Sequence, residues 1–436
     1  MHARTRRAAI GLLLTAGLIA SASTSAAAQP TGISVGDNPI AIEISPDGTR
    51  AYVSNAADRT VSVISTASRT VTATVNVGTQ PEGIAFSPDS RTAYVTNAGD
   101  HNTDWGSVSV IDTATSTVTR TVSVDPLKAP KAIAVAPDGS KAYAVGSNHL
   151  AVINTATGVS HPVYVGGNAT DVQITPDGSR LYVADFYNSR VVVVSTATES
   201  VIATVPLPTA PNHIAITPNG TRAYVTSYSS NKVYLITTAD NQIGATVDVP
   251  GGPLGVAAAP NGGQIYLTGH QAHTLMTLSV NTNTIIQTRP GGWYPRSVAI
   301  TPNGFEAYAL QAYYVSVTDI SSVNEPGPDR LVRGESLTAY QSRTSPDGKY
   351  RLLMQADGNL VLYVAATNQA LWATHTHGSG ATRVTLQHDG NLVLYAPNNV
   401  PKWSTHTWNT AADRLLVQND SGLALYGPGG TRFWTR

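Results

Sequence analysis

Three copies of one polar pattern near the C-terminus hold the residue types best suited to binding chemistry. They begin at positions 355, 387 and 418, so neighbouring copies start 32 and 31 residues apart. The first copy places Gln355, Asp357, Asn359, Val361 and Tyr363 at every second position. Residues two apart share one face of a β-strand, so the sequence predicts that these five line one face while the leucines between them enter a core.

The second copy repeats all five residue types, as Gln387, Asp389, Asn391, Val393 and Tyr395. Such a face offers amide donors, a carboxylate acceptor, a phenol and a small apolar patch. That set suits a sugar, which has hydroxyl groups and an apolar C–H face. The alternative is a polar strand face that only contacts water. A solvated face does not need the same five residue types in each copy, so the repetition favours binding.

The third copy departs from the pattern. It keeps Gln418, Asp420 and Tyr426, but Gly422 replaces the Asn and Ala424 replaces the Val. Loss of the amide removes a hydrogen bond worth about 0.5–1.5 kcal/mol. We therefore expect a weak third site.

Residues 329–436 resemble the bulb-type (monocot mannose-binding, B-type) lectins, whose motif is Gln-x-Asp-x-Asn-x-Val-x-Tyr. The resemblance implies a threefold β-prism with three Trp at its centre. It also implies that Asp and Asn hold the axial 2-hydroxyl of mannose, Gln reaches the 3-hydroxyl, Tyr reaches the 4-hydroxyl and Val packs on the ring, without a metal or cofactor. A second family feature follows each copy, at Trp372-Ala373-Thr374, Trp403-Ser404-Thr405 and Trp434-Thr435.

A different repeat precedes this region. A Pro-Asp/Asn-Gly/Ser turn recurs with spacings of 42, 49, 39, 42, 42 and 42 residues. Pro presets the turn and Gly tolerates positive φ, so the turn explains its Asp residues without a metal. Repeats of about 40 residues, each with four short strands, are typical of a β-propeller. The turns begin at Pro46, Pro88, Pro137, Pro176, Pro218, Pro260 and Pro302.

The tetrapeptide Tyr94-Val95-Thr96-Asn97 resembles the YVTN group of propeller repeats, and the resemblance extends over residues 32–322. It implies a fold but hardly an activity, since relatives include surface-layer proteins, lyases, lactonases and quinoprotein-like chains. The sequence therefore predicts an all-β chain. We expect a seven-bladed β-propeller over 29–322, closed by a strand at 32–36, then a linker over 323–328 and a β-prism over 329–436.

Two parts of the predicted propeller could bind a ligand. One is a long loop with His101, Asn102, Asp104 and Trp105, for which sequence drift in a solvent-exposed loop is the alternative. The other is the channel mouth just before each inner strand, where the charges are mixed and no catalytic set is evident. The mouth residues are Ile40, Glu82, Lys131, Asp171, Asn212, His213, Leu254 and Arg296.

Composition and the N-terminus narrow the function classes. Charged residues make up 12% of the 436 residues and the net charge is zero, which argues against nucleic acid as a partner. Residues 1–28 read as a signal peptide, with Arg4, Arg6 and Arg7 before an apolar stretch, so we expect secretion with no later membrane span. The Arg pair leaves the export route open, between the general and the twin-arginine pathway.

The sequence thus predicts a secreted protein that binds mannose-type glycans, with the propeller as a scaffold or as a module for a protein partner. No catalytic residue, metal or cofactor is assigned. The alternative is a propeller enzyme, such as a lyase, lactonase or other hydrolase, that its lectin domain targets to glycans.

Overall fold

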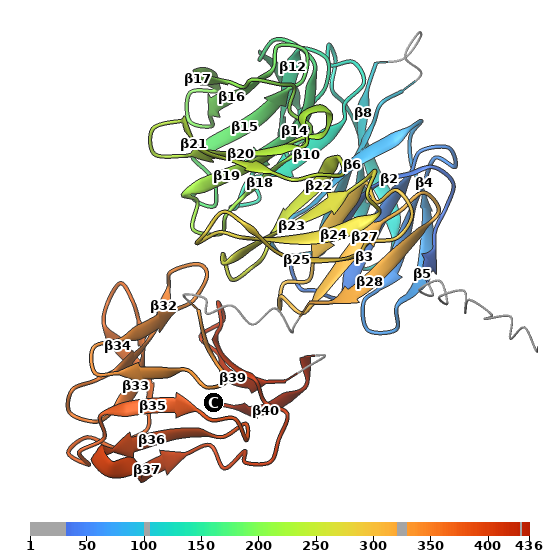
Figure 1. Cartoon of the computed structure of the whole chain (residues 1–436). Helices are drawn as coiled ribbons and strands as arrows, with labels where there is room; N and C mark the ends of the chain where they lie inside the picture. The colour runs from blue at the N-terminus through green and yellow to red at the C-terminus, as the bar shows by residue number, and fades with distance from the viewer. Residues whose placement is uncertain (1–31, 100–104, 321–328, 428–429) are drawn as a thin grey trace, which may run out of the picture. The chain divides into compact units, whose positions relative to one another are not determined.

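The computed structural model describes residues 32–99, 105–320, 329–427 and 430–436 (Figure 1). The predicted signal segment, the linker and the loop residues His101, Asn102 and Asp104 lie outside these ranges. The described residues form ten four-stranded antiparallel sheets and two short 3-10 helices, η1 (Tyr228–Ser230) and η2 (Pro397–Asn399). Seven sheets lie between residues 33 and 319, and three lie between residues 330 and 435.

The first of the two parts contains six sheets whose strands follow the order of the chain. Their strands are β2 (Pro39–Ile44), β3 (Arg50–Asn55), β4 (Thr60–Ser65), β5 (Thr70–Asn76); β6 (Pro81–Phe86), β7 (Thr92–Asn97), β8 (Ser107–Asp112), β9 (Thr117–Ser123); β10 (Ala132–Val135), β11 (Lys141–Val145), β12 (His149–Asn154), β13 (Ser160–Tyr164); β14 (Ala169–Ile174), β15 (Arg180–Asp185), β16 (Arg190–Ser195), β17 (Ser200–Pro206); β18 (Ile214–Ile216), β19 (Arg222–Ser227), β20 (Lys232–Thr237), β21 (Gln242–Asp248); and β22 (Pro253–Ala258), β23 (Gln264–Gly269), β24 (Thr274–Ser279), β25 (Ile285–Pro290).

The seventh sheet joins the two ends of this part of the chain. It contains β26 (Ser297–Ile300), β27 (Glu306–Leu310), β28 (Tyr314–Asp319) and β1 (Ile33–Ser34), and Ile33 pairs with Val315. Each innermost strand contacts the innermost strand of the next sheet, and β26 contacts β2, so the seven sheets form a closed ring. Every innermost strand therefore has a neighbouring innermost strand on each side.

The burial of each strand follows its place in a sheet. The four Val residues of β16 are all buried, because neighbouring sheets cover both faces of a middle strand. The outermost strands, such as β5, alternate between exposed and half-buried residues over most of their length, because only one face packs. The chain therefore reads as apolar runs in the middle strands and as an alternating Thr/Val pattern in the outermost ones.

Five of the seven repeated Pro-Asp/Asn turns are stabilised by a Ser or Thr two residues before the Asp or Asn. Ser45 donates its hydroxyl to Asp47 Oδ1 at 2.6 Å, and the same oxygen accepts the Thr49 N–H at 3.0 Å. Gly48 takes the left-handed conformation there, with φ of 73°. Ser87, Thr175, Thr217 and Thr301 do the same for the Asp or Asn of their own turns. The turn carboxylates are thereby satisfied within their own loops.

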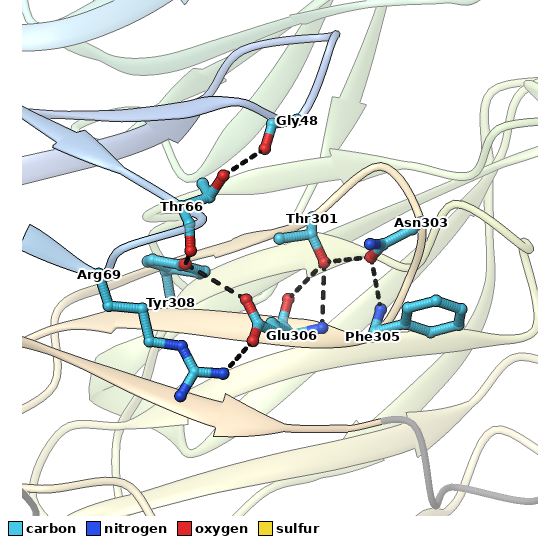
Figure 2. A network of polar contacts seen from close by, with 8 residues as sticks. All are labelled: Gly48, Thr66, Arg69, Thr301, Asn303, Phe305, Glu306 and Tyr308. Carbon is cyan, nitrogen blue, oxygen red and sulfur yellow. Dashed lines mark hydrogen bonds and ion pairs between the residues drawn. The ribbon is translucent and has the colours of Figure 1, made fainter. Parts of the chain in front are cut away.

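Polar contacts also link the first and last sheets of the ring, as Figure 2 shows. The Arg69 guanidinium donates to Glu306 on β27, and the Tyr308 hydroxyl donates to the same carboxylate at 3.2 Å. Arg69 lies between β4 and β5, so this ion pair spans 237 residues of sequence. The pairing of β1 with β28 closes the ring by backbone hydrogen bonds, and this ion pair adds a side-chain contact between the first and last sheets.

The C-terminal part contains three further sheets, which share one core. Leucines from all three sheets are fully buried in it, as predicted for the leucines between the motif positions. The strands are β31 (Ser342–Thr344), β32 (Tyr350–Met354), β33 (Leu360–Val364), β34 (Gln369–Ala373); β30 (Ser336–Thr338), β35 (Arg383–Leu386), β36 (Leu392–Ala396), β37 (Val400–Ser404); and β29 (Arg330–Val332), β38 (Arg414–Val417), β39 (Leu423–Tyr426), β40 (Arg432–Thr435).

Three Trp side chains, one from each sheet, meet beside this core. The ring centroids of Trp372, Trp403 and Trp434 are 5.9, 5.9 and 6.1 Å apart, and each pair meets edge to face. The resemblance implies three Trp at a common centre, and the edge-to-face arrangement lets each ring contact both others with favourable quadrupole geometry. The triangle therefore fixes the three sheets around a common centre.

Candidate functional site

Each polar motif begins as a turn and ends as a strand, which corrects the prediction of one continuous strand face. Gln355 donates its backbone N–H to the Asn359 carbonyl at 2.8 Å, and β33 begins only at Leu360. Asp357 Oδ1 accepts the Asn359 N–H at 3.0 Å, and Gly358 has φ of 87°. The reason is the Asp-Gly pair, which favours a tight turn over an extended chain. The polar side chains therefore come from a turn, whereas Val361 and Tyr363 belong to β33. Tyr363 is half-buried there, and Val361, which was expected to pack on the sugar ring, is only 3% exposed.

The first motif holds its polar side chains with internal hydrogen bonds. Gln355 donates its amide nitrogen to the Tyr363 hydroxyl at 2.9 Å. Asn359 Oδ1 accepts both the Thr374 hydroxyl at 3.0 Å and the Thr376 N–H at 3.1 Å. The Asn amide is thereby oriented with its oxygen inward and its NH₂ group unoccupied by these partners. Sequence reasoning missed the role of the two Thr, which the spacing Trp-x-Thr-x-Thr could have signalled.

The second motif reproduces this arrangement. Gln387 donates to the Tyr395 hydroxyl at 2.6 Å, and Asn391 Oδ1 accepts the Thr405 hydroxyl and the Thr407 N–H, each at 3.1 Å. A surface hollow of about 560 Å³ lies over this motif. It is lined by Gln387, Asn391, Val393, Tyr395, Pro401, Lys402, Trp403, Ser404 and His406. Asp389 is not among the lining residues, although its Oδ1 accepts the Asn391 N–H at 2.9 Å.

The third motif keeps the turn and loses the oriented amide. Gln418 donates its N–H to the Gly422 carbonyl at 2.8 Å, and Asp420 Oδ1 accepts the Gly422 N–H at 2.7 Å, as in the other two copies. Arg436 stands two residues after Trp434, where the first copy has Thr374, and its N–H is bonded to the Leu423 carbonyl at 3.0 Å. Both the amide and the hydroxyl that would hold it are therefore replaced together.

The ring has a separate polar site in its central channel. A cavity of about 380 Å³ there is lined by Glu43, Glu82, Lys131, Asp171 and His213, along with apolar residues of the inner strands. Asp171 joins two sheets, since Oδ2 accepts the Ile214 N–H at 2.7 Å. Of the predicted mouth residues, Ile40 and Asn212 also line the cavity, whereas Leu254 and Arg296 do not.

Glu43 is the residue of this channel that sequence reasoning missed. Water reaches its side chain through the channel, but protein surrounds it, so loss of solvation and then the charge of Asp171 raise its pKa to about 8. Burial also raises the pKa of Glu82 to about 7, against the opposing charge of Lys131. Both carboxyls are thereby poised to exchange protons near neutral pH.

A comparison of repeats would have found Glu43. In every sheet of the ring, a Tyr of the second strand pairs with one residue of the innermost strand. Five of these seven partners are Ala, and only Glu43 is acidic. The seven are Glu43, Ala85, Ala134, Gln173, Ala215, Ala257 and Ala299.

Aromatic side chains gather on loops between strands of the ring. Tyr294 contacts the rings of His270, His273 and Trp293, with the nearest centroid, that of His273, at 4.5 Å. Its φ of 47° is unusual for a bulky residue, and the interblade position it occupies is filled by smaller residues such as Asn38 elsewhere. Trp293 and Tyr294 are 62% and 45% exposed, so the group presents ring faces to solvent.

Only Trp105 of the predicted ligand loop lies within the described residues. Its ring is half exposed, and the Lys128 ammonium lies 4.9 Å from the ring centroid. The described residues contain no group of three or more His, Cys, Asp or Glu side chains arranged to hold a metal ion. None of their helices is long and apolar enough to cross a membrane.

Comparison with known proteins identifies the fold but no function. No family model and no curated protein matches the chain. A structure of Kuenenia stuttgartiensis hydrazine synthase matches with a TM-score of 0.59 and 23% identity over 68% of this chain and 99% of that one. The β-propeller domain of Cps50 (Swd1) from Myceliophteria thermophila matches with a TM-score of 0.58 and 11% identity over 67% and 99%. The predicted all-β chain with a β-propeller is thus confirmed, and likeness at these identities extends to the fold alone.

Proposed function

We propose that the chain is a secreted carbohydrate-binding protein that recognises mannose-type glycans through its first two motifs. In this proposal the seven sheets of the ring are the blades of one YVTN-type propeller, and the three C-terminal sheets are a bulb-type lectin prism. The observation that carries the proposal is the repeated hydrogen-bond set around Asn359 and Asn391. Two copies hold the same amide in the same orientation through different Thr residues.

The groups left free by these bonds suit a sugar. Because Asn359 Oδ1 is taken by Thr374 and Thr376, its NH₂ group remains to donate to a hydroxyl. Asp357 uses Oδ1 in the turn and keeps Oδ2 as an acceptor. Gln355 donates to Tyr363, which leaves the Gln oxygen to accept and the phenol hydrogen to donate. Each motif thus offers both donors and acceptors, as the hydroxyls of a pyranose require.

Multivalency would provide most of the binding strength. Each site lies at the surface, with only its Asp exposed, so we expect a dissociation constant of about 1 mM, equivalent to about −4 kcal/mol. Two competent sites held on one domain would bind a polymannose surface far more tightly than either alone. The third motif, at Gln418, Asp420 and Tyr426, would contribute little.

The rest of the chain would deliver and extend this activity. The basic and apolar segment within residues 1–28 supports export, and hence an extracellular location. The exposed aromatic group around Trp293 and Tyr294 supports a role for the propeller in binding a protein partner. Neither role needs a nucleic acid or a membrane span.

The test is binding of the full-length protein to immobilised mannan, competed by free mannose or by glucose. Glucose differs from mannose at the 2-hydroxyl, which the two Asn amides are proposed to read, so mannose should compete and glucose should compete much less. The double variant Asn359→Ala/Asn391→Ala should lose binding. Retention of mannan by a folded double variant would refute the proposal.

A propeller enzyme targeted to glycans is the second candidate. It is supported by Glu43, whose raised pKa suits proton transfer, near Asp171 in the channel. Turnover of a lactone or polyuronate panel that disappears in Glu43→Gln, with mannan binding retained, would favour it. Equal turnover by wild type and variant would exclude a role of Glu43 in such an activity.

A further inference from the structure

The surroundings of Tyr395 in the second site differ in charge from those of Tyr363 in the first. Arg383 on β35 pairs directly with Tyr395 on β36, and its guanidinium lies 4.8 Å from the centre of the Tyr ring. Directly paired residues of antiparallel strands share a face, so Arg383 lies on the binding side. On the other side of β36, Pro401 of β37 pairs with Tyr395, and the neighbouring Lys402 lines the hollow. Lys402 thus lines the hollow, and Arg383, which is not among its lining residues, lies over the Tyr395 ring beside it.

Neither cation is neutralised by the protein. Arg383 donates to the side-chain oxygen of Asn399, which is uncharged, and Lys402 is exposed. Among the described residues, neither forms an ion pair with a carboxylate. The motif residue Asp389 is the one acidic side chain between residues 358 and 412, and its Oδ1 is already used in the turn. The second site therefore carries a net positive charge at neutral pH.

The cations around the motif Tyr differ among the three copies. In the first, Arg351 pairs with Tyr363 as Arg383 does with Tyr395, but Leu371 stands in the place of Lys402. In the third, Arg414 pairs with Tyr426 and donates to Asp413 at 2.6 Å. Lys402 is thus a cation that the first site lacks, and in the third motif the corresponding strand instead pairs Arg432 with Tyr426.

We infer that the second motif site prefers a mannose-type glycan with an anionic substituent, bound between Lys402 and Arg383. The inference rests on the proposed function and on the resemblance to bulb-type lectins, which implies that Tyr395 reaches the sugar 4-hydroxyl. A substituent on carbon 4, or on carbon 6 one bond beyond the ring, would then lie at the Tyr end of the hollow, between the two cations. A phosphate ester and a uronate carboxylate share this chemistry.

The expected preference is modest for one sugar because Lys402 is exposed. Ion pairs at exposed positions change affinity by about 2–5-fold, and the preference should fall as salt rises from about 50 to 300 mM. The Lys402 ammonium is a point charge on a flexible side chain, so it can pair with a phosphate or with a carboxylate.

The experiment isolates the second site in the full-length protein with Asn359→Asp, and the first site with Asn391→Asp. Affinity is measured for neutral mannan, phosphomannan and a mannuronate polymer, and the anionic-to-neutral ratio is compared. We expect a ratio above one at the second site that Lys402→Leu lowers and Lys402→Arg retains. Leu371→Lys should raise the ratio at the first site. Lys349→Leu, the same charge change at an exposed Lys outside the motifs, controls for net charge.

The outcomes separate this inference from the proposal on which it rests. Neutral mannan bound with a ratio near one, or a ratio that Lys402→Leu leaves unchanged, overturns the anionic preference and leaves the lectin proposal standing. Binding of no polymer overturns both. A Lys402-dependent ratio for phosphomannan but not for mannuronate supports the inference and identifies the substituent as phosphate, and the reverse result identifies a carboxylate.

Discussion

The two repetitive parts of this molecule use their repeats in opposite ways. In the C-terminal sheets, the polar side chains are what repeats: Asn359 and Asn391 are held by equivalent Thr pairs. In the propeller, the turns repeat while the channel groups do not, since Glu43 stands where five other sheets have Ala. A repeated binding group suits a ligand that is itself repetitive, whereas a unique group on a symmetric scaffold suits a single, asymmetric ligand.

The third motif shows which polar residues the fold itself requires. Its turn bonds match those of the other copies although Gly422 has replaced the Asn. The backbone of Gln418 and the carboxylate of Asp420 are therefore explained by the turn alone. The Asn amide and its Thr partners are dispensable for the turn, and this is what makes their retention in the first two copies informative about binding.

The largest effect should come from replacing both motif amides by acids. In Asn359→Asp/Asn391→Asp, an oxygen still accepts from Thr374 and Thr405, but the NH₂ donor becomes a second oxygen beside the motif Asp. Loss of one donor and added repulsion should weaken mannan binding at least about tenfold per site. Binding to mannan-coated beads measures this.

The control for that variant is Asn409→Asp, the same change at an exposed loop position outside the motifs. It should bind as wild type does. Unaltered binding by the double acid variant would mean that the amides do not contact the sugar, and the repeated groups would then be structural.

The phenol groups should matter less. Tyr363→Phe and Tyr395→Phe each remove one hydroxyl that accepts from Gln and remains free to donate. One hydrogen bond of about 0.5–1.5 kcal/mol corresponds to a loss of about 2–10-fold per site. Titration with mannose measures the loss, and Tyr426→Phe in the third motif should have no effect. An equal loss in Tyr426→Phe would show that the third site is functional.

Rebuilding the third site would sharpen the comparison further. Gly422→Asn alone should fail, because Arg436 stands at the position where Thr374 orients the amide of the first copy. Gly422→Asn/Arg436→Thr should raise mannose capacity from two sites to three. Calorimetric titration at high mannose concentration counts the sites. A gain from the single variant would contradict the role assigned to the Thr hydroxyl.

The sequence predicts a feature when residues at a fixed local spacing determine it. The propeller turns follow from Pro, Asp and Gly at fixed spacing, and the buried leucines follow from alternation. The start of β33 does not, because an Asp-Gly pair overrides the alternation and folds Gln355 to Asn359 into a turn. The Thr374 contact lies 15 residues from Asn359 and depends on how β33 pairs with β34, which no local pattern states.

Glu43 escapes prediction for a related reason. It lies within the inner strand β2, whereas the predicted mouth residues stand just before the inner strands, and only alignment of the seven Tyr pairs reveals it as an exception. The charge of Asp171 that raises its pKa comes from a different sheet, far from Glu43 in the sequence. Such properties arise from closure of the ring and not from any single repeat.

The smallest expected effect tests whether that unique group is coupled to folding. The pKa of Glu43 is raised from its usual value to about 8, so the folded chain binds this proton more tightly than the unfolded chain does. Between about pH 4.5 and 8 the unfolded state therefore holds fewer protons, and stability falls as pH rises through this window. Glu43→Gln cannot ionise and should escape the fall. Its midpoint of thermal unfolding should match wild type at pH 5 and exceed it by about 2 °C at pH 9, a small difference because solvent in the channel screens the charge.

An exposed turn carboxylate supplies the control of opposite sign. The hydroxyl of Ser87 donates to Asp89 and lowers the pKa of that carboxyl, so its stabilisation is present above the usual Asp range and is lost as pH falls. Asp89→Asn should therefore differ from wild type at neutral pH and converge with it in acid, the reverse of Glu43→Gln. Parallel profiles of unfolding midpoint against pH for the two variants would show that Glu43 titrates like a repeated turn residue. The channel would then have no distinct titratable group.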